Sequence, residues 1–199
     1  MIVKVCGMRD PENIRAVEAL GVDLMGFIFY PPSPRFVGDK APSYLPGCTR
    51  VGVFVNEPED AVLRRCEEFG ISTVQLHGKE TPEYCTGLRS MGYKVIKAFS
   101  VSGKEDIEKA ASYEGCCDMF LFDTKCSSVG GSGVSFDWSV LQSYEGNTPF
   151  LLSGGIGPES ELDSFKHPML AGYDLNSRFE TAPGMKDEEK LKEFIGKLK

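Results

Sequence analysis

The stretch Phe120-Leu121-Phe122-Asp123-Thr124-Lys125 decides the fold, because it is an apolar run that ends directly in reactive side chains. The same order occurs in Val3-Lys4-Val5, which leads to Cys6-Gly7, and in Phe150-Leu151-Leu152, which leads to Ser153-Gly154-Gly155. When reactive and glycine-rich residues follow the C-terminal ends of apolar runs, the simplest fold is a barrel of alternating strands and helices. Such a barrel carries its active site at the C-terminal ends of its strands.

Eight such apolar runs recur along the chain, and several are continuous rather than alternating. Continuous runs are typical of parallel strands that are covered on both faces. The predicted strands cover residues 2–5, 24–29, 51–55, 73–76, 95–98, 119–122, 150–152 and 172–175.

Segments with helical spacing separate these runs and predict helices over residues 11–20, 61–69, 81–91, 104–111, 159–165 and 188–198. Asp10 is a fitting N-cap for the first helix, with Pro11 at its first position. Residues 38–47 contain two prolines and predict a short or irregular second helix. No linker divides the chain, so we predict a single-domain (β/α)₈ TIM barrel over residues 1–199.

An open, doubly wound sheet is the alternative fold, since it also alternates strands and helices. Its usual mark is G-x-G-x-x-G after the first strand. The first predicted strand ends instead in Cys6-Gly7-Met8-Arg9, and the glycine-rich turns follow the sixth and seventh strands. The closed barrel is therefore favoured.

Bulk composition limits the function. The formal net charge of −7 argues against a nucleic-acid partner, and no apolar run approaches the ~20 residues that span a membrane. Seven cysteines without regular spacing fit a reducing cytoplasm, and only two histidines argue against a histidine-rich metal site. We expect a cytoplasmic protein that uses no metal.

Two glycine-rich loops predict a phosphate site. Gly131-Ser132-Gly133 follows the sixth strand, Ser153-Gly154-Gly155 follows the seventh, and Asn176-Ser177 follows the eighth as a possible helix start. Backbone N–H groups of such loops approach anions closely, although glycine clusters also form plain turns. Their occurrence on consecutive loops of a barrel favours a phosphorylated small-molecule substrate.

Cys6 and Asp123 are the candidate base and acid. A cysteine beside an apolar strand is usually a buried small hydrophobe, but Cys6 ends the first strand and can act as a base if nearby cations lower the pKa of its thiol. Asp123 ends the sixth strand, where burying a carboxylate is costly unless something offsets the loss of water. Its carboxylate either caps a helix or fixes a loop, or it takes part in acid–base catalysis. On a closed barrel the two would face each other across the mouth.

Arg35 and His77 are candidate binding residues. Arg35 lies in the proline-rich loop Pro31-Pro32-Ser33-Pro34-Arg35, and its guanidinium either holds a substrate carboxylate or pairs with a neighbouring carboxylate of the protein. His77 ends the fourth strand, and it is either a ligand contact or a structural histidine whose hydrogen bonds are satisfied within the protein.

Eight motifs together resemble those of phosphoribosylanthranilate isomerases, in the family's order from Val3 to Lys186. They are Val5-Cys6-Gly7-Met8, Gly26-Phe27-Ile28-Phe29-Tyr30 with Ser33-Pro34-Arg35, Val51-Gly52-Val53-Phe54-Val55-Asn56, Val74-Gln75-Leu76-His77-Gly78, Phe122-Asp123-Thr124-Lys125, Gly131-Ser132-Gly133 with Phe136-Asp137-Trp138, Leu152-Ser153-Gly154-Gly155-Ile156, and Asp174-Leu175-Asn176-Ser177-Arg178-Phe179-Glu180.

The resemblance implies a cofactor-free (β/α)₈ enzyme of tryptophan biosynthesis. Such an enzyme converts N-(5-phosphoribosyl)anthranilate to 1-(2-carboxyphenylamino)-1-deoxyribulose 5-phosphate by an Amadori rearrangement. It implies Asp123 as general acid, Cys6 as general base, Arg35 at the anthranilate carboxylate, and Asp174 and His77 near the aromatic ring or the sugar. The phosphate is then expected at the loops Gly131–Gly133, Ser153–Gly155 and Asn176–Ser177.

One departure from the family pattern is Val134-Ser135, where relatives often carry a polar residue before the Phe-Asp-Trp element. Two alternatives remain: a metal-dependent pentose phosphate epimerase, which needs more strand-end histidines, and a barrel that binds a phosphorylated metabolite without catalysis. The sequence leaves both a monomer and a homodimer open.

Overall fold

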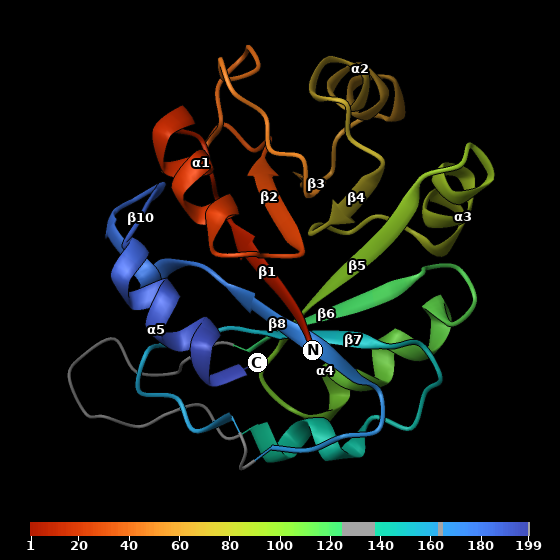
Figure 1. Cartoon of the computed structure of the whole chain (residues 1–199). Helices are drawn as coiled ribbons and strands as arrows, with labels where there is room; N and C mark the ends of the chain where they lie inside the picture. The colour runs from red at the N-terminus through yellow and green to blue at the C-terminus, as the bar shows by residue number, and fades with distance from the viewer. Residues whose placement is uncertain (125–137, 163–164, 199) are drawn as a thin grey trace.

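Eight parallel strands close into a barrel, in which each strand pairs with the next and β8 pairs back with β1 (Figure 1). The computed structural model describes residues 1–124, 138–162 and 165–198. The strands are β1 (Ile2–Cys6), β2 (Leu24–Ile28), β3 (Thr49–Phe54), β4 (Thr73–Leu76), β5 (Lys94–Val101), β6 (Met119–Thr124), β7 (Phe150–Ser153) and β8 (Leu170–Leu175). The closed barrel predicted from the apolar runs is confirmed, and the open sheet is excluded.

Alternation along the strands separates two layers of apolar side chains. Val51, Ile96, Ala98, Leu121 and Leu151 form one buried cluster, whereas their neighbours along the strands pack in a larger cluster together with the helices. Because successive side chains of a strand point to opposite faces, the smaller cluster fills the interior of the barrel. A strand residue can therefore be assigned to the interior or the outer layer by its position.

Helices surround the strands (Figure 1). The α-helices within the described residues are α1 (Pro11–Ala19), α2 (Glu59–Phe69), α3 (Pro82–Ser90), α4 (Lys104–Glu108) and α5 (Glu188–Leu198). The Asp10 side chain accepts hydrogen bonds from the N–H groups of Glu12 and Asn13, which confirms it as the N-cap of α1. No helix in this part of the chain is both long and apolar enough to cross a membrane.

Three helix predictions need correction. Residues 38–47 contain no helix, and the prediction over 104–111 ends early because α4 gives way to a 3₁₀ segment, η1 (Lys109–Tyr113). The prediction over 159–165 is wrong for its described residues, which hold no α-helix. There the Ser160 hydroxyl accepts from the N–H of Gly157 and the Ser160 N–H donates to the carbonyl of Gly157, so a turn replaces the helix. The βα repeat is thus regular in its strands but not in its helices.

A short antiparallel hairpin follows β8 and was not predicted. It consists of β9 (Glu180–Ala182) and β10 (Met185–Lys186), and β10 lies near α5 and α1 (Figure 1). The side chain of Asn13 in α1 fixes the hairpin, since it donates to the Lys186 carbonyl at 2.9 Å and accepts from the Lys186 N–H at 2.7 Å. This pairing satisfies a buried amide and ties the end of the chain to its beginning.

Replacing Asn13 with Ala is therefore expected to lower the free energy of unfolding by about 2 kcal/mol, because both buried backbone groups of Lys186 lose their partner. Chemical denaturation measures this loss. Asn147→Ala, at an exposed asparagine, is the matched control and should change stability by less than about 0.5 kcal/mol. Equal stability of the two variants would contradict the role assigned to Asn13.

Candidate active site

Four polar side chains line one arc of the barrel mouth. They lie at the C-terminal ends of four neighbouring strands: Cys6 and Ser153 are the last residues of β1 and β7, and Asp174 and Asp123 are the last but one of β8 and β6. Their neighbours Val5, Leu175, Leu152 and Phe122 belong to the outer layer, so alternation directs all four toward the barrel axis. The structure thus places the predicted acid and base at the two ends of one arc, with β7 and β8 between them.

Cys6 lies at the buried end of this arc, with only 3% of its surface exposed. Lys4 precedes it by two residues on the same face of β1, and its Nζ lies 2.8 Å from Asp174 Oδ1. Burial would lower the pKa of Lys4, but the Asp174 carboxylate outweighs it and raises that pKa, so Lys4 stays charged.

The pKa of the Cys6 thiol is raised, not lowered. Burial is the largest cause, and the positive charges of Lys4 and Lys186 oppose it without cancelling it. The nearby cations that the sequence argument asked for are present and do act to lower this pKa, but desolvation and the Asp174 carboxylate outweigh them. Desolvation thus works against the thiolate form of Cys6, and the two ammonium groups work in its favour.

Asp123 lies at the open end of the arc, and 34% of its side chain is exposed. The Nε2 atom of His77 lies 3.5 Å from Asp123 Oδ2, and the Nδ1 atom of His77 lies 3.3 Å from Gln75 Nε2. The His77 ring thus lies between the predicted acid Asp123 and Gln75 of β4.

Arg35 meets a carboxylate of the protein itself. Its Nε and Nη2 atoms donate to Glu180 of β9, with Nη2 at 2.6 Å from Oε2. The Arg35 side chain lies over Gly7, where an added Cβ would lie 2.8 Å from Arg35 Cδ; Gly7 also has a φ of +79°, so only glycine suits the position. Arg35 therefore lies beside the mouth, with its Nη1 edge facing away from this pair.

Glu180 links Arg35 to a second buried cation. It also accepts from Lys186 Nζ at 2.5 Å, and Lys186 Nζ in turn donates to Asn176 Oδ1 at 2.8 Å. Burial would raise the pKa of Glu180, but hydrogen bonds from Arg35 and Lys186 outweigh it and lower that pKa. Glu180 is thus an anion between two cations.

The predicted phosphate loops are described in part. Gly131, Ser132 and Gly133 lie outside the described residues. After Ser153, Gly154 and Gly155 have φ of +87° and +68°, and a Cβ on Gly154 would lie 2.1 Å from the Thr124 carbonyl oxygen. The Thr124 hydroxyl donates to the carbonyls of Ser153 and Gly154. The backbone of Gly154 therefore lies so close to β6 that only glycine fits at this position.

The third element of the predicted phosphate site begins at Asn176. Ser177 is exposed and opens a short 3₁₀ helix, η4 (Ser177–Phe179), as expected for a helix start after β8. The Asn176 side chain is already engaged by Lys186 and lies near Gly7 and Arg35, so this residue also belongs to the Arg35 side of the mouth.

Sequence reasoning missed Lys4, Glu180 and Lys186 as members of the site. A signal existed for Lys4, because a lysine inside an apolar strand must find an anion when the strand is buried. Glu180 and Lys186 carried no such signal, since they lie in the hairpin that was not predicted. The described residues hold no cluster of three or more His, Cys, Asp or Glu side chains suited to a metal ion.

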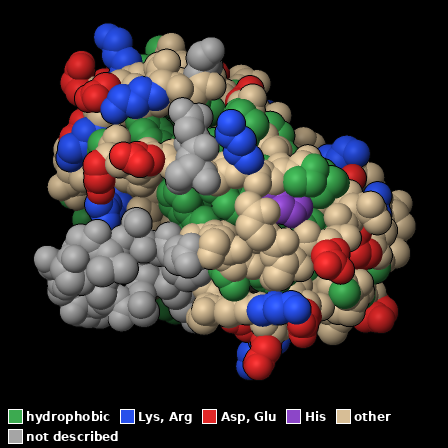
Figure 2. All heavy atoms as spheres, turned by 90° about the horizontal axis from the view of Figure 1, so that it is seen from below, with side chains coloured by type: hydrophobic (Ala, Val, Ile, Leu, Met, Phe, Trp, Pro, Cys, Tyr) green, Lys and Arg blue, Asp and Glu red, His purple; other side chains and the backbone are tan. Residues whose placement is uncertain are grey.

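Charge on one face of the molecule is mixed. In Figure 2, Lys and Arg side chains alternate with Asp and Glu side chains, and no continuous basic patch is visible among the described residues on that face.

Comparisons with known proteins identify the family of the chain. The family model described as N-(5'phosphoribosyl)anthranilate (PRA) isomerase matches residues 3–197. The chain belongs to this family. The phosphoribosylanthranilate isomerase resemblance read from the eight motifs is therefore confirmed.

Relatives and solved structures in the family cover nearly the whole chain. A protein of Phocaeicola vulgatus named N-(5'-phosphoribosyl)anthranilate isomerase is 56% identical over 202 residues, which is 100% of this chain and 98% of the relative. The crystal structure of phosphoribosyl anthranilate isomerase from Thermus thermophilus is 33% identical, with a TM-score of 0.81, and covers 100% of this chain and 98% of that one.

A third structure is a phosphoribosyl anthranilate isomerase in complex with reduced 1-(o-carboxyphenylamino)-1-deoxyribulose 5-phosphate. It is 32% identical to this chain, with a TM-score of 0.80, and covers 98% of this chain and 97% of that one. A phosphorylated sugar that carries a carboxyphenyl group thus binds to a barrel of this family.

Proposed function

We propose that this chain is a cytoplasmic enzyme of tryptophan biosynthesis that isomerises N-(5-phosphoribosyl)anthranilate to 1-(2-carboxyphenylamino)-1-deoxyribulose 5-phosphate, with Asp123 as general acid and Cys6 as general base. The observation that carries this assignment is the arc of the barrel mouth, where a thiol and a carboxyl end two strands and point to one axis. Family membership supports the reaction, and the arc supports the assignment of its two proton transfers.

The first step opens the sugar ring. Asp123 gives its proton to the furanose ring oxygen, the bond from that oxygen to C1 breaks, and the anthranilate nitrogen supplies the electron pair that forms a C1–N iminium. Asp123 becomes a carboxylate, and the ring oxygen becomes a hydroxyl. The exposed end of the arc suits this residue, because it must regain a proton after each turnover.

The second step moves the double bond. The Cys6 thiolate takes the proton from C2, and the electrons of that bond form C1=C2 while the iminium nitrogen recovers its electron pair. The enolamine then tautomerises to the ketone. Because burial disfavours the thiolate, the ammonium groups of Lys4 and Lys186 contribute by stabilising it.

Arg35 is proposed to hold the anthranilate carboxylate. Glu180 occupies one edge of the guanidinium and fixes its plane, which leaves the Nη1 edge for a second carboxylate. The Ser153–Gly155 and Asn176–Ser177 segments, together with Gly131–Gly133, are proposed to bind the phosphate.

The activity test is the decay of N-(5-phosphoribosyl)anthranilate fluorescence on addition of purified protein, with a metal chelator present. We expect full turnover in chelator. Binding of the phosphorylated substrate without turnover would indicate a non-catalytic barrel, and chelator-sensitive activity on a pentose phosphate would indicate an epimerase.

Arg35→Lys is expected to raise KM by about tenfold with a smaller change in kcat, because an ammonium cannot bridge Glu180 and a substrate carboxylate as a planar guanidinium can. Steady-state kinetics measure this change. The control is Arg15→Lys, at an exposed arginine paired with Glu12 on α1, and it should leave both constants unchanged. An unchanged KM in Arg35→Lys would remove Arg35 from the carboxylate site.

A further inference from the structure

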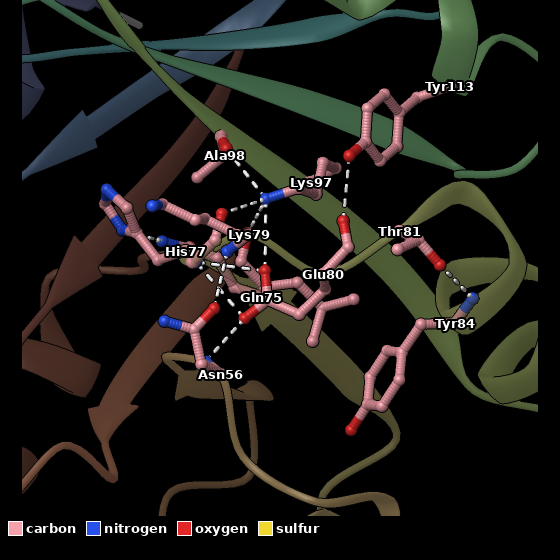
Figure 3. Close-up of polar contacts among 12 residues, drawn as sticks. Asn56, Gln75, His77, Lys79, Glu80, Thr81, Tyr84, Lys97, Ala98 and Tyr113 are labelled. Carbon is pink, nitrogen blue, oxygen red and sulfur yellow. Dashed lines mark hydrogen bonds and ion pairs between the residues drawn. The ribbon is translucent and has the colours of Figure 1, made fainter.

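The hydrogen bond between Gln75 and His77 determines which nitrogen of His77 carries the proton. Gln75 Nε2 lies 3.3 Å from His77 Nδ1 (Figure 3). An amide nitrogen is only a donor, so Nδ1 is the acceptor and the neutral ring carries its proton on Nε2. That Nε2 atom is the one that lies 3.5 Å from Asp123 Oδ2.

The Gln75 side chain lies inside the barrel, and its carbonyl oxygen has no hydrogen-bond partner among the described residues. The residue is 1% exposed. Leaving a buried carbonyl unpaired is unfavourable, and native structures rarely keep such a group without a role. In this orientation the amide presents its N–H donor to His77 and leaves its carbonyl oxygen unpaired.

A buried ion pair fixes the backbone on both sides of His77. Lys97 Nζ lies 3.1 Å from Glu80 Oε2 (Figure 3). It also donates to the carbonyls of Leu76 and Gly78, the two neighbours of His77. Glu80 in turn accepts from the N–H of Gly78.

The same cluster reaches the adjoining loop after β3. Glu80 accepts from the N–H of Asn56, and the N–H of His77 itself donates to the carbonyl of Phe54. The imidazole is thus carried by a backbone with few remaining degrees of freedom, as a preorganised site needs.

We propose that His77 is a positioning residue that donates an Nε2–H hydrogen bond to the carboxylate of Asp123, and that Gln75 sets the tautomer which makes this possible. The proposal rests on the proposed role of Asp123 as general acid. Asp123 becomes an anion when it gives up its proton, and a fixed donor then stabilises the charge that develops. The 3.5 Å separation shortens as that charge forms, as catalytic hydrogen bonds often do on reaction.

The tautomer can be read directly from ¹⁵N spectra of histidine-labelled protein, because the chain holds only His77 and His167. His167 is an internal control, since its Nδ1 accepts from the Met169 N–H and its Nε2 lies 3.0 Å from the Tyr144 carbonyl oxygen. Near pH 9, well above the range in which free histidine titrates, both rings should show Nε2–H.

Gln75→Met keeps the length of the side chain and removes the donor. We expect the variant to mix the two tautomers of His77, leave His167 unchanged and lower kcat by about tenfold with KM within about twofold. A His77 ring that stays wholly Nε2–H in the variant, or one that is Nδ1–H in the unmodified protein, would overturn the role of Gln75. The spectra need no turnover, so this result is independent of the proposed reaction.

Two variants of His77 separate positioning from substrate binding. His77→Gln places an amide N–H near the position of Nε2 and should retain most of kcat, whereas His77→Leu should lower kcat on the order of 10²-fold with little change in KM. A higher KM at unchanged kcat in His77→Leu would instead make His77 a substrate contact and overturn the proposal. If the unmodified protein does not turn over the substrate, the proposed function fails first, and the spectra alone decide the hydrogen-bond arrangement.

Discussion

Asp123→Asn is expected to lower kcat on the order of 10⁴-fold while the protein stays folded, because an amide cannot donate a proton to the ring oxygen. The substitution keeps the shape of the side chain and its place on β6. Since 34% of the side chain is exposed, the loss of charge should cost little stability. Turnover of N-(5-phosphoribosyl)anthranilate and thermal unfolding of the same sample measure the two quantities.

Asp118→Asn is the matched control, because Asp118 directly precedes the same strand at the opposite end of the barrel. Its carboxylate accepts from the Val95 N–H at 2.9 Å and pairs with Lys94 and Arg89. This variant should retain kcat and lose about 1 kcal/mol of stability. Full activity in Asp123→Asn, or an equal loss of activity in both variants, would contradict the assignment of the acid.

Cys6→Ser is expected to lower kcat on the order of 10³-fold, because a hydroxyl does not ionise under conditions in which a thiol beside two ammonium groups can. Cys6→Ala should be equally slow if the sulfur acts as a base and not as packing. The protein should remain folded, since both replacements fit the space of the Cys6 side chain, but with some loss of stability because the site is buried. Single-turnover fluorescence measures the residual rates.

Cys66→Ser on α2 is the matched control for the cost of placing a hydroxyl at a buried thiol. Cys66 is 2% exposed and belongs to the outer apolar layer, away from the mouth. It should lose stability and keep kcat. If Cys6→Ser were as active as Cys66→Ser, Cys6 would be a packing residue.

The barrel could be predicted because its signal is local. Each strand is a short apolar run, and the reactive residues follow the run directly, as in the segments that end at Cys6, Asp123 and Ser153. Regular alternation then places these side chains on the axis without knowledge of the rest of the chain.

Helices were predicted less well, because short helices depend on the packing around them. Residues 159–165 have the spacing of Leu162 and Phe165, which suits one helical face, yet both side chains are buried without an α-helix in the described residues. A side chain that bonds its own backbone turn, as Ser160 does, competes with helix formation.

The electrostatics of the site could not be predicted because its partners are distant in the sequence. Lys4 meets Asp174, 170 residues away, and Arg35 meets Glu180, 145 residues away. Only the closure of the barrel and the unpredicted hairpin bring these charges together. The raised pKa of Cys6 follows from that burial, and no local pattern indicates it.

The rate of C2–H cleavage tests the division of labour between Cys6 and Asp123 most directly. Single turnover of substrate deuterated at C2 of the ribose should be slower than that of protonated substrate in Cys6→Ser, where proton removal limits the rate, and equal to it in Asp123→Asn, where ring opening limits it. The reverse pattern, or no isotope effect in either variant, would contradict the account.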